Sequence, residues 1–418
     1  MQVLAKSAVE AVLSALLQDE LALLRQGDSA QVKGLSFHSG TRLTLAQRAQ
    51  DHPDEILIDS FEWMALATRV VNFFCLDSSG LEDYLLRRYT IGEWAEIVIN
   101  SRELASTDIR FVTSGSTGTP TTFTHPFSSL IAEVDFFKNY LLQLPTAPTR
   151  IVSLVPAHHI YGFLFSVLLP DALQVPVTRS LRSFSLVFGN RLEEGDIVIA
   201  FPSMLQEVTT RGVSMAAGVQ FICSTGPCPP EVLTGVEALG AQPVIEVFGS
   251  TDTSGIGVRN SPAKPFKLMP RWARQGSESL YDHLLQREVA LPDHLDWVDE
   301  DYFRPQRRRD HAVSVNGVNV FPQRIADILS RHPDVRDARV RLLSATNSRG
   351  LKALLIVDTQ LTAAEEAQLQ DEMKDYAVEH LASTERPQRY TLATQIPRND
   401  MGKEIDWDTT NDSNQRGS

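Results

Sequence analysis

From residue 109 onward, the chain alternates short apolar runs with helical segments. The segments 126–142 and 230–239 have the apolar spacing expected for helices, and each lies between two apolar runs. The runs, each short enough for one strand, are 109–112, 151–155, 197–200, 219–223 and 244–248. Strands that alternate with helices predict a largely parallel sheet. The sequence therefore predicts an α/β fold.

The sequence also divides into a large N-terminal part and a small C-terminal part. Residues 261–310 are rich in Pro and Arg, only weakly periodic, and end in Arg307-Arg308-Arg309-Asp310. We place the boundary there, which gives domains of residues 1–309 and 310–418, the second being a small α+β domain. Further helices are expected at 2–26, 91–99 (capped by Thr90), 324–331 and 363–381, and further strands at 339–343 and 351–357.

Charge and hydropathy exclude several classes of protein. The formal net charge is −13 at pH 7, which argues against nucleic acid or an anionic membrane as the main partner, but not against a nucleotide in a local site. No window reaches the about 18 apolar residues of a membrane span, and the first residues lack the basic start of a signal peptide. The three cysteines form no disulfide or zinc pattern. We therefore expect a cytoplasmic protein.

A run of hydroxyl residues and glycines follows the first apolar run. It reads Thr113-Ser114-Gly115-Ser116-Thr117-Gly118-Thr119-Pro120. Glycine lets the backbone approach a ligand closely, and successive backbone N–H groups then form a concave site for an anion. The GxxxxGKS/T pattern of a Walker P-loop is absent. The run predicts a different kind of loop, one that wraps a polyphosphate.

Three more motifs follow in order. Phe248-Gly249-Ser250-Thr251-Asp252 ends the last apolar run, at the carboxyl edge where open α/β sheets bind ligands. An aromatic ring there can stack on a base, and a carboxylate can hold Mg²⁺. The third motif consists of Arg308-Arg309-Asp310 and the segment 316–322. The fourth is the segment 396–403, in which Lys403 follows a glycine near the C-terminus.

These four motifs, in this order, resemble the adenylate-forming superfamily of acyl-CoA synthetases, peptide-synthetase adenylation domains and luciferases. The resemblance extends from about residue 105 to residue 407. Residues 155–162 are similar to the family's acyl-pocket segment, with His159 at its histidine, and residues 224–227 to its adenine-side loop. The resemblance implies a large N-terminal domain with mixed, mostly parallel sheets and a small C-terminal domain on a hinge.

The resemblance also implies a nucleotide site. The β- and γ-phosphates of ATP would lie against Thr113, Ser114, Gly115, Ser116, Thr117 and Gly118. Adenine would stack on Phe248, beside Gly249, Ser250, Thr225 and Gly226. The ribose would contact Arg308 and Asp293, with Asp296 as the competing alignment.

The catalytic residues implied by the resemblance are few. Thr251 would contact the α-phosphate and Asp252 would hold Mg²⁺. Lys403 would bridge the acid's carboxylate, the ribose and the α-phosphate, and Asp310 would be the hinge. His159 and Gly226 would line the acid pocket.

The chain departs from the family pattern at several positions. Thr121 stands where the phosphate loop has a lysine, which Arg110 or another base would have to replace. Asp252 replaces a glutamate, Ser314 a lysine after the hinge, and Arg307 a glycine. The segment before the phosphate loop and the one between Asp252 and Asp293 are also short for the family.

The sequence predicts an ATP-dependent ligase that activates a carboxylic acid as its adenylate and transfers it to a pantetheine thiol of CoA or an acyl carrier protein. The pocket segment favours an aryl acid such as 4-hydroxybenzoate or 4-coumarate. The compact form resembles small bacterial ligases of aryl-polyene and xanthomonadin-type pigment pathways. Three alternatives stay open: a ligase with a non-thiol acceptor, a medium-chain fatty acid ligase, and a degenerate nucleotide-binding scaffold.

Overall fold

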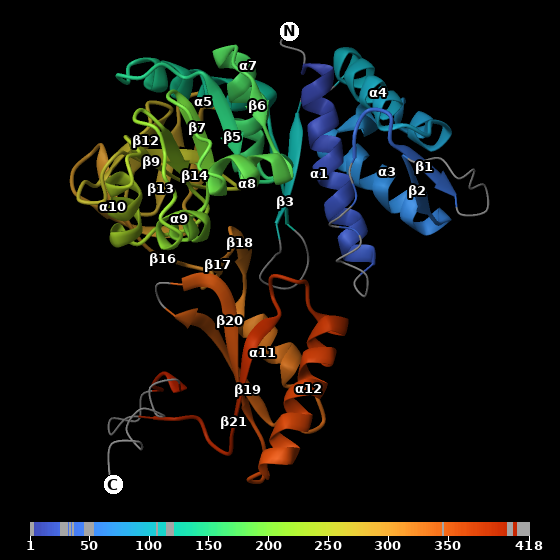
Figure 1. Ribbon diagram of the computed structural model, residues 1–418, viewed down its shortest axis with the longest axis vertical. Coiled ribbons are helices and arrows are strands. Elements are labelled where there is room, and N and C mark those ends of the chain that lie inside the picture. The colour runs from blue at the N-terminus through green and yellow to red at the C-terminus, as the bar shows by residue number, and fades with distance from the viewer. Residues whose placement is uncertain are drawn as a thin grey trace. The chain divides into compact units, whose positions relative to one another are not determined.

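The computed structural model describes residues 4–25, 32, 35, 37–45, 54–105, 108–113, 121–344, 347–398 and 404–407. The chain forms two compact units, and the division falls between Arg309 and Asp310 (Figure 1). We call them the N-terminal and C-terminal units. Ser114 to Pro120 of the phosphate loop, and Lys403, lie outside the described residues.

A nine-stranded sheet organises the N-terminal unit, with the order β15-β16-β11-β10-β9-β8-β7-β5-β6 (Figure 1). Five neighbouring strands are parallel: β6 (Val177–Thr178), β5 (Arg150–Ser153), β7 (Asp196–Ala200), β8 (Gln220–Cys223) and β9 (Val244–Ser250). The other four are antiparallel: β10 (Ser254–Arg259), β11 (Phe266–Leu268), β16 (Tyr302–Arg308) and β15 (Asp293–Trp297). The expected α/β fold with a mixed sheet is confirmed, although the large sheet is parallel from β6 to β9 and antiparallel from β9 to β15 rather than mostly parallel.

Alternate residues of the parallel strands enter two separate cores. Ile197 and Ile199 of β7 lie in one core, and Val198 and Ala200 lie in the other. This is the period of two that a strand imposes on its side chains. Because helices cover both faces, β7 and β8 are buried throughout, which explains why they read as continuous apolar runs.

Helices from different parts of the chain form those two layers. The first core takes residues of α1 (Lys6–Leu24), α3 (Ser60–Phe74), α4 (Ile91–Leu104) and α5 (Phe127–Leu142). The second core takes residues of α8 (Ser180–Phe188), α9 (Pro202–Thr210) and α10 (Pro230–Ala238). The side chain of Thr90 caps α4 by accepting from the Glu93 backbone N–H. The helix starts where the sequence predicts and ends five residues later than expected, at Leu104 rather than residue 99.

The stretch 261–310, which is weakly periodic in sequence, forms strands. It contributes β11, β15 and β16 to the large sheet. It also forms a three-stranded antiparallel sheet of β12 (Trp272–Gln275), β13 (Ser279–Asp282) and β14 (Arg287–Ala290). Two small sheets complete the N-terminal unit: β1 (Arg42–Leu45) with β2 (Glu55–Ile58), and β3 (Ile109–Thr113) with β4 (Thr121–His125).

The C-terminal unit is an α+β structure. A hairpin of β17 (Val313–Val315) and β18 (Val318–Val320) turns at Asn316 and Gly317, whose φ values of 50° and 83° suit the Asn-Gly pair of a tight hairpin. The rest is α11 (Pro322–Leu329), β19 (Asp337–Ser344), β20 (Asn347–Ile356), α12 (Ala363–His380) and β21 (Pro387–Ala393). Within the described residues of both units, no helix combines the length and hydropathy of a membrane span.

Candidate nucleotide and acid site

The predicted ligand segments gather at one edge of the large sheet. Residues 155–162 follow β5, residues 224–227 follow β8, and Phe248 to Asp252 end β9. Because these strands are parallel, their carboxyl ends lie at the same edge. The chain goes outward from β5 to β6 and then returns to β7 on the other side of β5. Such a switch point is where open α/β sheets bind ligands.

The turn that carries Thr251 and Asp252 is held from outside its own motif. Nε2 of His125, at the end of β4, lies 2.7 Å from the backbone oxygen of Thr251. Burial lowers the pKa of His125, so the ring is neutral and donates this hydrogen bond. Within the turn, the Thr253 backbone N–H donates to the hydroxyl of Ser250 over 3.1 Å. The hairpin that brackets the phosphate loop is thus tied to the turn after β9.

A buried carboxylate supports the same turn from α5. Glu133 is 3% exposed and accepts hydrogen bonds from the hydroxyl of Ser254, over 2.5 Å, and from the backbone N–H of Gly255, over 3.1 Å. Ser254 has a φ of 63°, a strained value for a residue with a side chain. Burial raises the pKa of Glu133, against its hydrogen bonds.

Asp252 lies in the turn itself and is half-buried. Burial raises the pKa of its carboxyl group, and the charge of Arg287 on β14 acts in the opposite direction. No hydrogen bond reaches the carboxylate from the described part of the chain. A carboxylate with raised pKa and free oxygens suits a hard cation such as Mg²⁺, so the donor chemistry fits the predicted metal role.

The adenine side has a polar atom without a partner. Thr225 has a φ of 83°, and its hydroxyl is buried with no hydrogen bond among the described residues. Strained backbone and unsatisfied polar groups concentrate at ligand sites. Across the edge, the ring of Phe248 is half-buried against Phe266 and Phe303, at 5.7 and 5.6 Å between ring centroids. Its remaining surface is available for a base.

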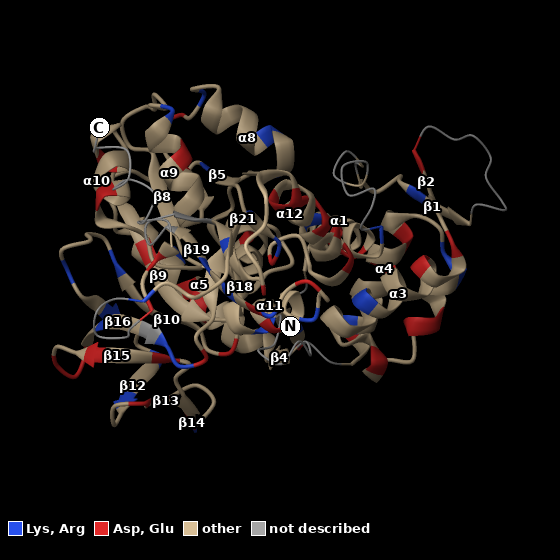
Figure 2. Ribbon diagram, turned by 90° about the horizontal axis from the view of Figure 1, so that it is seen from below, with Lys and Arg blue, Asp and Glu red and all other residues tan. Residues whose placement is uncertain are grey.

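The register of β15 and β16 separates the two ribose candidates. Asp293 is 8% exposed and lies directly opposite Arg308. Asp296 is exposed and accepts a hydrogen bond from Gln306. Figure 2 shows the acidic residues of β15 beside the basic residues of β16. The structure therefore brings Asp293 and Arg308 together and leaves Asp296 outside that pair.

The acid-pocket segment is anchored at the switch point. The hydroxyl of Tyr161 lies 2.7 Å from the Ile222 carbonyl oxygen and 3.0 Å from that of Ala200, at the ends of β8 and β7. The following segment, η5 (Phe163–Leu168), is π-helical, a geometry frequent at functional sites. His159 just before it is exposed, whereas His158 is buried.

The predicted hinge residue Asp310 and Arg110 of β3 both have defined surroundings. Oδ1 of Asp310 accepts the backbone N–H of Ala312 over 3.1 Å, which fixes a short turn at the proposed hinge. Arg110 contacts Asp77, with 3.3 Å between Nη1 and Oδ1. This guanidinium is therefore already engaged by a carboxylate, which weakens the case for Arg110 as a substitute for the missing loop lysine.

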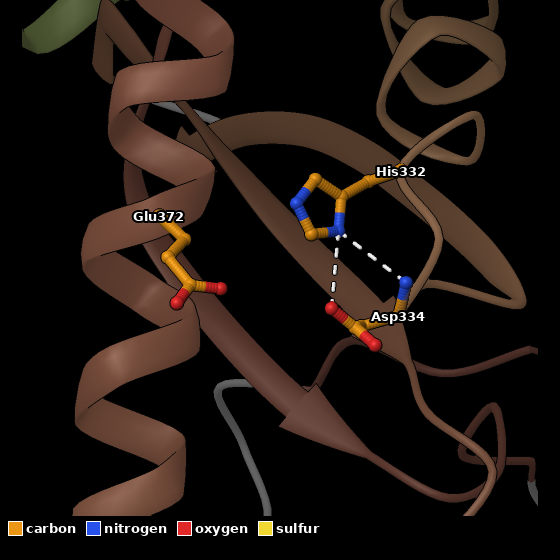
Figure 3. A group of neighbouring side chains, drawn as sticks. All are labelled: His332, Asp334 and Glu372. Carbon is orange, nitrogen blue, oxygen red and sulfur yellow. Dashed lines mark hydrogen bonds and ion pairs between the residues drawn. The ribbon is translucent and has the colours of Figure 1, made fainter.

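A second group of side chains could hold a metal ion in the C-terminal unit. Ligand atoms of His332, Asp334 and Glu372 all lie within 4.8 Å of one another (Figure 3). However, Nδ1 of His332 already accepts the backbone N–H of Asp334 over 3.4 Å, and both carboxylates are exposed. We assign this group no part in the reaction.

Sequence reasoning missed His125, Glu133 and Asp19 of α1. The first two touch the turn after β9 from positions more than a hundred residues away, and Asp19 approaches His158 in the same long-range manner. None of them lies in a local motif. The one available signal was the rarity of a charged residue on the apolar face of a helix, which applies to Glu133.

The comparisons with known proteins agree with this arrangement. A profile described as AMP-binding enzyme matches residues 35–278. The chain is 35% identical over 381 residues to the 4-coumarate–CoA ligase of Cereibacter sphaeroides, with 88% of this chain and 89% of the relative covered. It is 32% identical over 408 residues to the 4-coumarate–CoA ligase of Halorhodospira halophila, with 96% and 100% covered. The chain belongs to the AMP-binding enzyme family.

Solved structures support the fold. An o-succinylbenzoate CoA synthetase from Bacillus subtilis superimposes with a TM-score of 0.55 at 16% identity, covering 94% of this chain and 91% of that one. At this identity the likeness concerns the fold alone. It confirms the expected adenylate-forming fold.

Proposed function

We propose that this chain is an AMP-forming acid–CoA ligase that activates an aryl-acrylic acid of the 4-coumarate type. One observation carries the proposal: relatives named 4-coumarate–CoA ligase match nearly the whole chain at 32–35% identity. The geometry is consistent with it, since the nucleotide motifs and the acid-pocket segment share one edge of the sheet. Of the aryl acids predicted from the sequence, this favours 4-coumarate over 4-hydroxybenzoate.

The first half-reaction joins the acid to AMP. A carboxylate oxygen of the acid bonds to the α-phosphorus of ATP, and the bond from that phosphorus to pyrophosphate breaks. Negative charge grows on the phosphoryl oxygens, so positioning and cations matter more than proton transfer. Mg²⁺, when bound, would supply charge neutralisation there. In our proposal Asp252 holds this ion, Thr251 contacts the α-phosphate, and Lys403 brings the two repelling anions together.

The remaining residues orient the nucleotide. Thr113 and the loop residues that follow it surround the β- and γ-phosphates. The half-exposed face of Phe248 stacks on adenine, and the unpartnered hydroxyl of Thr225 offers it a hydrogen bond. Asp293 and Arg308, paired across β15 and β16, contact the ribose. The assignment of each of these roles is a proposal.

The second half-reaction forms the thioester. The CoA thiol loses its proton, its sulfur bonds to the acyl carbon, and AMP leaves. The C-terminal unit would turn about Asp310 between the two steps, exchanging Lys403 for the thiol. An acyl carrier protein as the acceptor, with an Arg-rich surface at 304–309 as its docking site, is a narrower proposal. Arg309 is already paired with Glu278, which speaks against its being free for such a partner.

Acid-dependent exchange of pyrophosphate into ATP tests the first step. We expect exchange with 4-coumarate and weaker exchange with benzoic acids or medium-chain fatty acids. Lys403→Ala should reduce exchange by at least about 100-fold, the range found when one charge-stabilising group is removed. The matched control is Lys374→Ala on α12, whose ammonium pairs with Asp371.

The outcomes separate the alternatives. Exchange without thioester on CoA or carrier protein would favour a non-thiol acceptor. Exchange only with fatty acids would overturn the aryl substrate. No exchange with any acid would overturn the enzymatic proposal and make the missing loop lysine at Thr121 decisive in favour of a scaffold.

A further inference from the structure

A polar connection runs from the N-terminal helix α1 to the acid-pocket segment. Nε2 of His158 lies 3.5 Å from Oδ2 of Asp19. His158 is 7% exposed, and neither ring nitrogen has a hydrogen-bond partner among the described residues, so the contact with Asp19 at ion-pair distance is the polar contact that the ring has there. A buried imidazole needs a polar partner because leaving it unpaired is unfavourable. Asp19 is therefore the group that fixes the ring of His158.

The ring of His158 in turn lies against that of His159. The two centroids are 4.4 Å apart with an interplanar angle of 38°. The backbone of His159 is fixed separately, because its carbonyl oxygen accepts the N–H of Phe163 over 2.7 Å. Its exposed side chain has no hydrogen bond that the described residues supply. His158 thus contacts both Asp19 and His159, the histidine that the proposed function assigns to the acid.

Asp19 is itself positioned by α3. Nη2 of Arg69 lies 3.6 Å from Oδ2 of Asp19, and Nε of Arg69 lies 3.7 Å from the neighbouring Glu20. Helix α1 packs against α3 and η5. The carboxylate of Asp19 therefore contacts both Arg69 of α3 and His158, and of these two residues only His158 belongs to the acid-pocket segment.

We infer that Asp19 is a positioning residue for acid binding: through His158 it holds the ring of His159 in the orientation that receives the substrate carboxylate. This inference rests on the proposed function, because it assigns His159 to the acid. It gives the N-terminal helices, which lie outside all the motifs, a part in substrate recognition.

The protonation states agree with this geometry. Burial alone would raise the pKa of Asp19, but its interaction with His158 lowers the pKa of this carboxyl group to about 2. At neutral pH, Asp19 is therefore ionised. The exposed ring of His159 can donate a hydrogen bond to a carboxylate.

The test compares two adjacent carboxylates of α1. Asp19→Asn keeps the shape and removes the charge that faces His158. Glu20→Gln is the matched control, because Glu20 contacts Arg69 but not His158. We expect Asp19→Asn to raise KM for 4-coumarate about tenfold in pyrophosphate exchange, equivalent to about 1.4 kcal/mol, with KM for ATP unchanged. Glu20→Gln should change neither constant by more than about twofold.

Two further variants separate positioning from simple stability. Asp19→Glu keeps the charge, so its KM for the acid should stay close to the wild-type value. This variant also provides the test if Asp19→Asn fails to fold. His158→Gln combined with Asp19→Asn should be no worse than the poorer single variant, since both break one connection.

The failures are distinguishable. If the wild-type protein shows normal exchange but Asp19→Asn has the same KM values as Glu20→Gln, this inference alone is overturned. Equal changes in KM for the acid and for ATP would overturn it as well, because a loss of folded protein or of the whole site would explain them. Absence of exchange in the wild-type protein would overturn the proposed function and this inference together.

Discussion

Two carboxylates lie at the turn between β9 and β10: the buried Glu133, which reaches it from α5, and the half-buried Asp252, which belongs to the turn itself. Burial raises the pKa of both. Glu133 receives two hydrogen bonds, from the Ser254 hydroxyl and the Gly255 N–H. The fold therefore explains Glu133, whereas Asp252 has the charge of Arg287 nearby but no hydrogen bond from the described residues.

The contrast distinguishes a carboxylate that stabilises this turn, Glu133, from one proposed to act in the reaction, Asp252. A carboxylate whose hydrogen bonds are satisfied inside the protein contributes mainly to stability. One that is half-buried and unsatisfied weakens the fold, and such strain is typical of functional sites. Substitution of Asp252 should therefore lower activity without lowering stability, and substitution of Glu133 should lower stability more than activity.

Asp252→Asn should give the largest effect, and on activity alone. We expect acid-dependent pyrophosphate exchange to fall by about 10²–10³-fold, or about 2.7–4 kcal/mol. The midpoint of thermal unfolding without ligands should stay the same or rise, because a carboxylate with raised pKa is replaced by a neutral amide. Calorimetric unfolding and the exchange assay, run on one preparation, check both halves.

A loss of stability in Asp252→Asn would contradict this contrast, because Asp252 would then stabilise the fold as Glu133 does. Unchanged exchange would remove Asp252 from the proposed metal role. Asp299→Asn is a suitable control, since that carboxylate accepts the backbone N–H groups of Asp301 and Tyr302 in a turn away from the motif.

Glu133→Ala should give the next largest effect, and on stability. It leaves the donors at Ser254 and Gly255 without their acceptor and opens a cavity, which should cost about 3 kcal/mol of unfolding free energy. Urea denaturation measures this directly. Exchange activity, measured well below the unfolding midpoint, should fall much less than in Asp252→Asn.

The pH dependence of stability sharpens the prediction for Glu133. Because burial raises its pKa above the ordinary 4.5, the folded protein keeps a proton that the unfolded chain loses as the pH rises. Stability from this group is fully present below 4.5 and is lost as the pH rises through the folded pKa. Glu133→Gln cannot ionise, so its stability should decline less than that of the wild type over the same rise. An equal decline in both proteins would contradict the raised pKa.

The sequence predicted the parts of this fold that local patterns encode. The parallel strands are buried on both faces, so β7 and β8 are visible as apolar runs. Strands β11 to β15, in contrast, combine buried residues with exposed or half-buried ones. In β16, Pro305 and several arginines hide the alternation, and the sequence therefore gave no strand there.

The site was predictable only as far as its motifs. Phe248 to Asp252 and residues 155–162 were expected at ligand-binding positions, and the structure puts both at the carboxyl edge. Glu133, His125 and Asp19 could not be found in the same way, because each reaches its target through tertiary packing rather than through a local pattern. The choice between Asp293 and Asp296 was open for a similar reason: both lie opposite an arginine of β16, and the burial that sets Asp293 apart depends on tertiary packing.

The same contrast between carboxylates recurs on β15, where we expect the smallest of these effects. Asp293 is buried opposite Arg308, and Asp296 is exposed and bonded to Gln306. If Asp293 contacts the ribose, Asp293→Asn should raise KM for ATP about tenfold, or about 1.4 kcal/mol, with KM for the acid unchanged. Asp296→Asn should change KM for ATP less than about twofold, because exposed polar contacts contribute little.

Here, unlike at the turn after β9, the buried carboxylate is the one assigned to the ligand. A larger effect in Asp296→Asn would therefore show that burial does not identify the ribose contact, and would return that role to the exposed Asp296, which lies opposite Arg304.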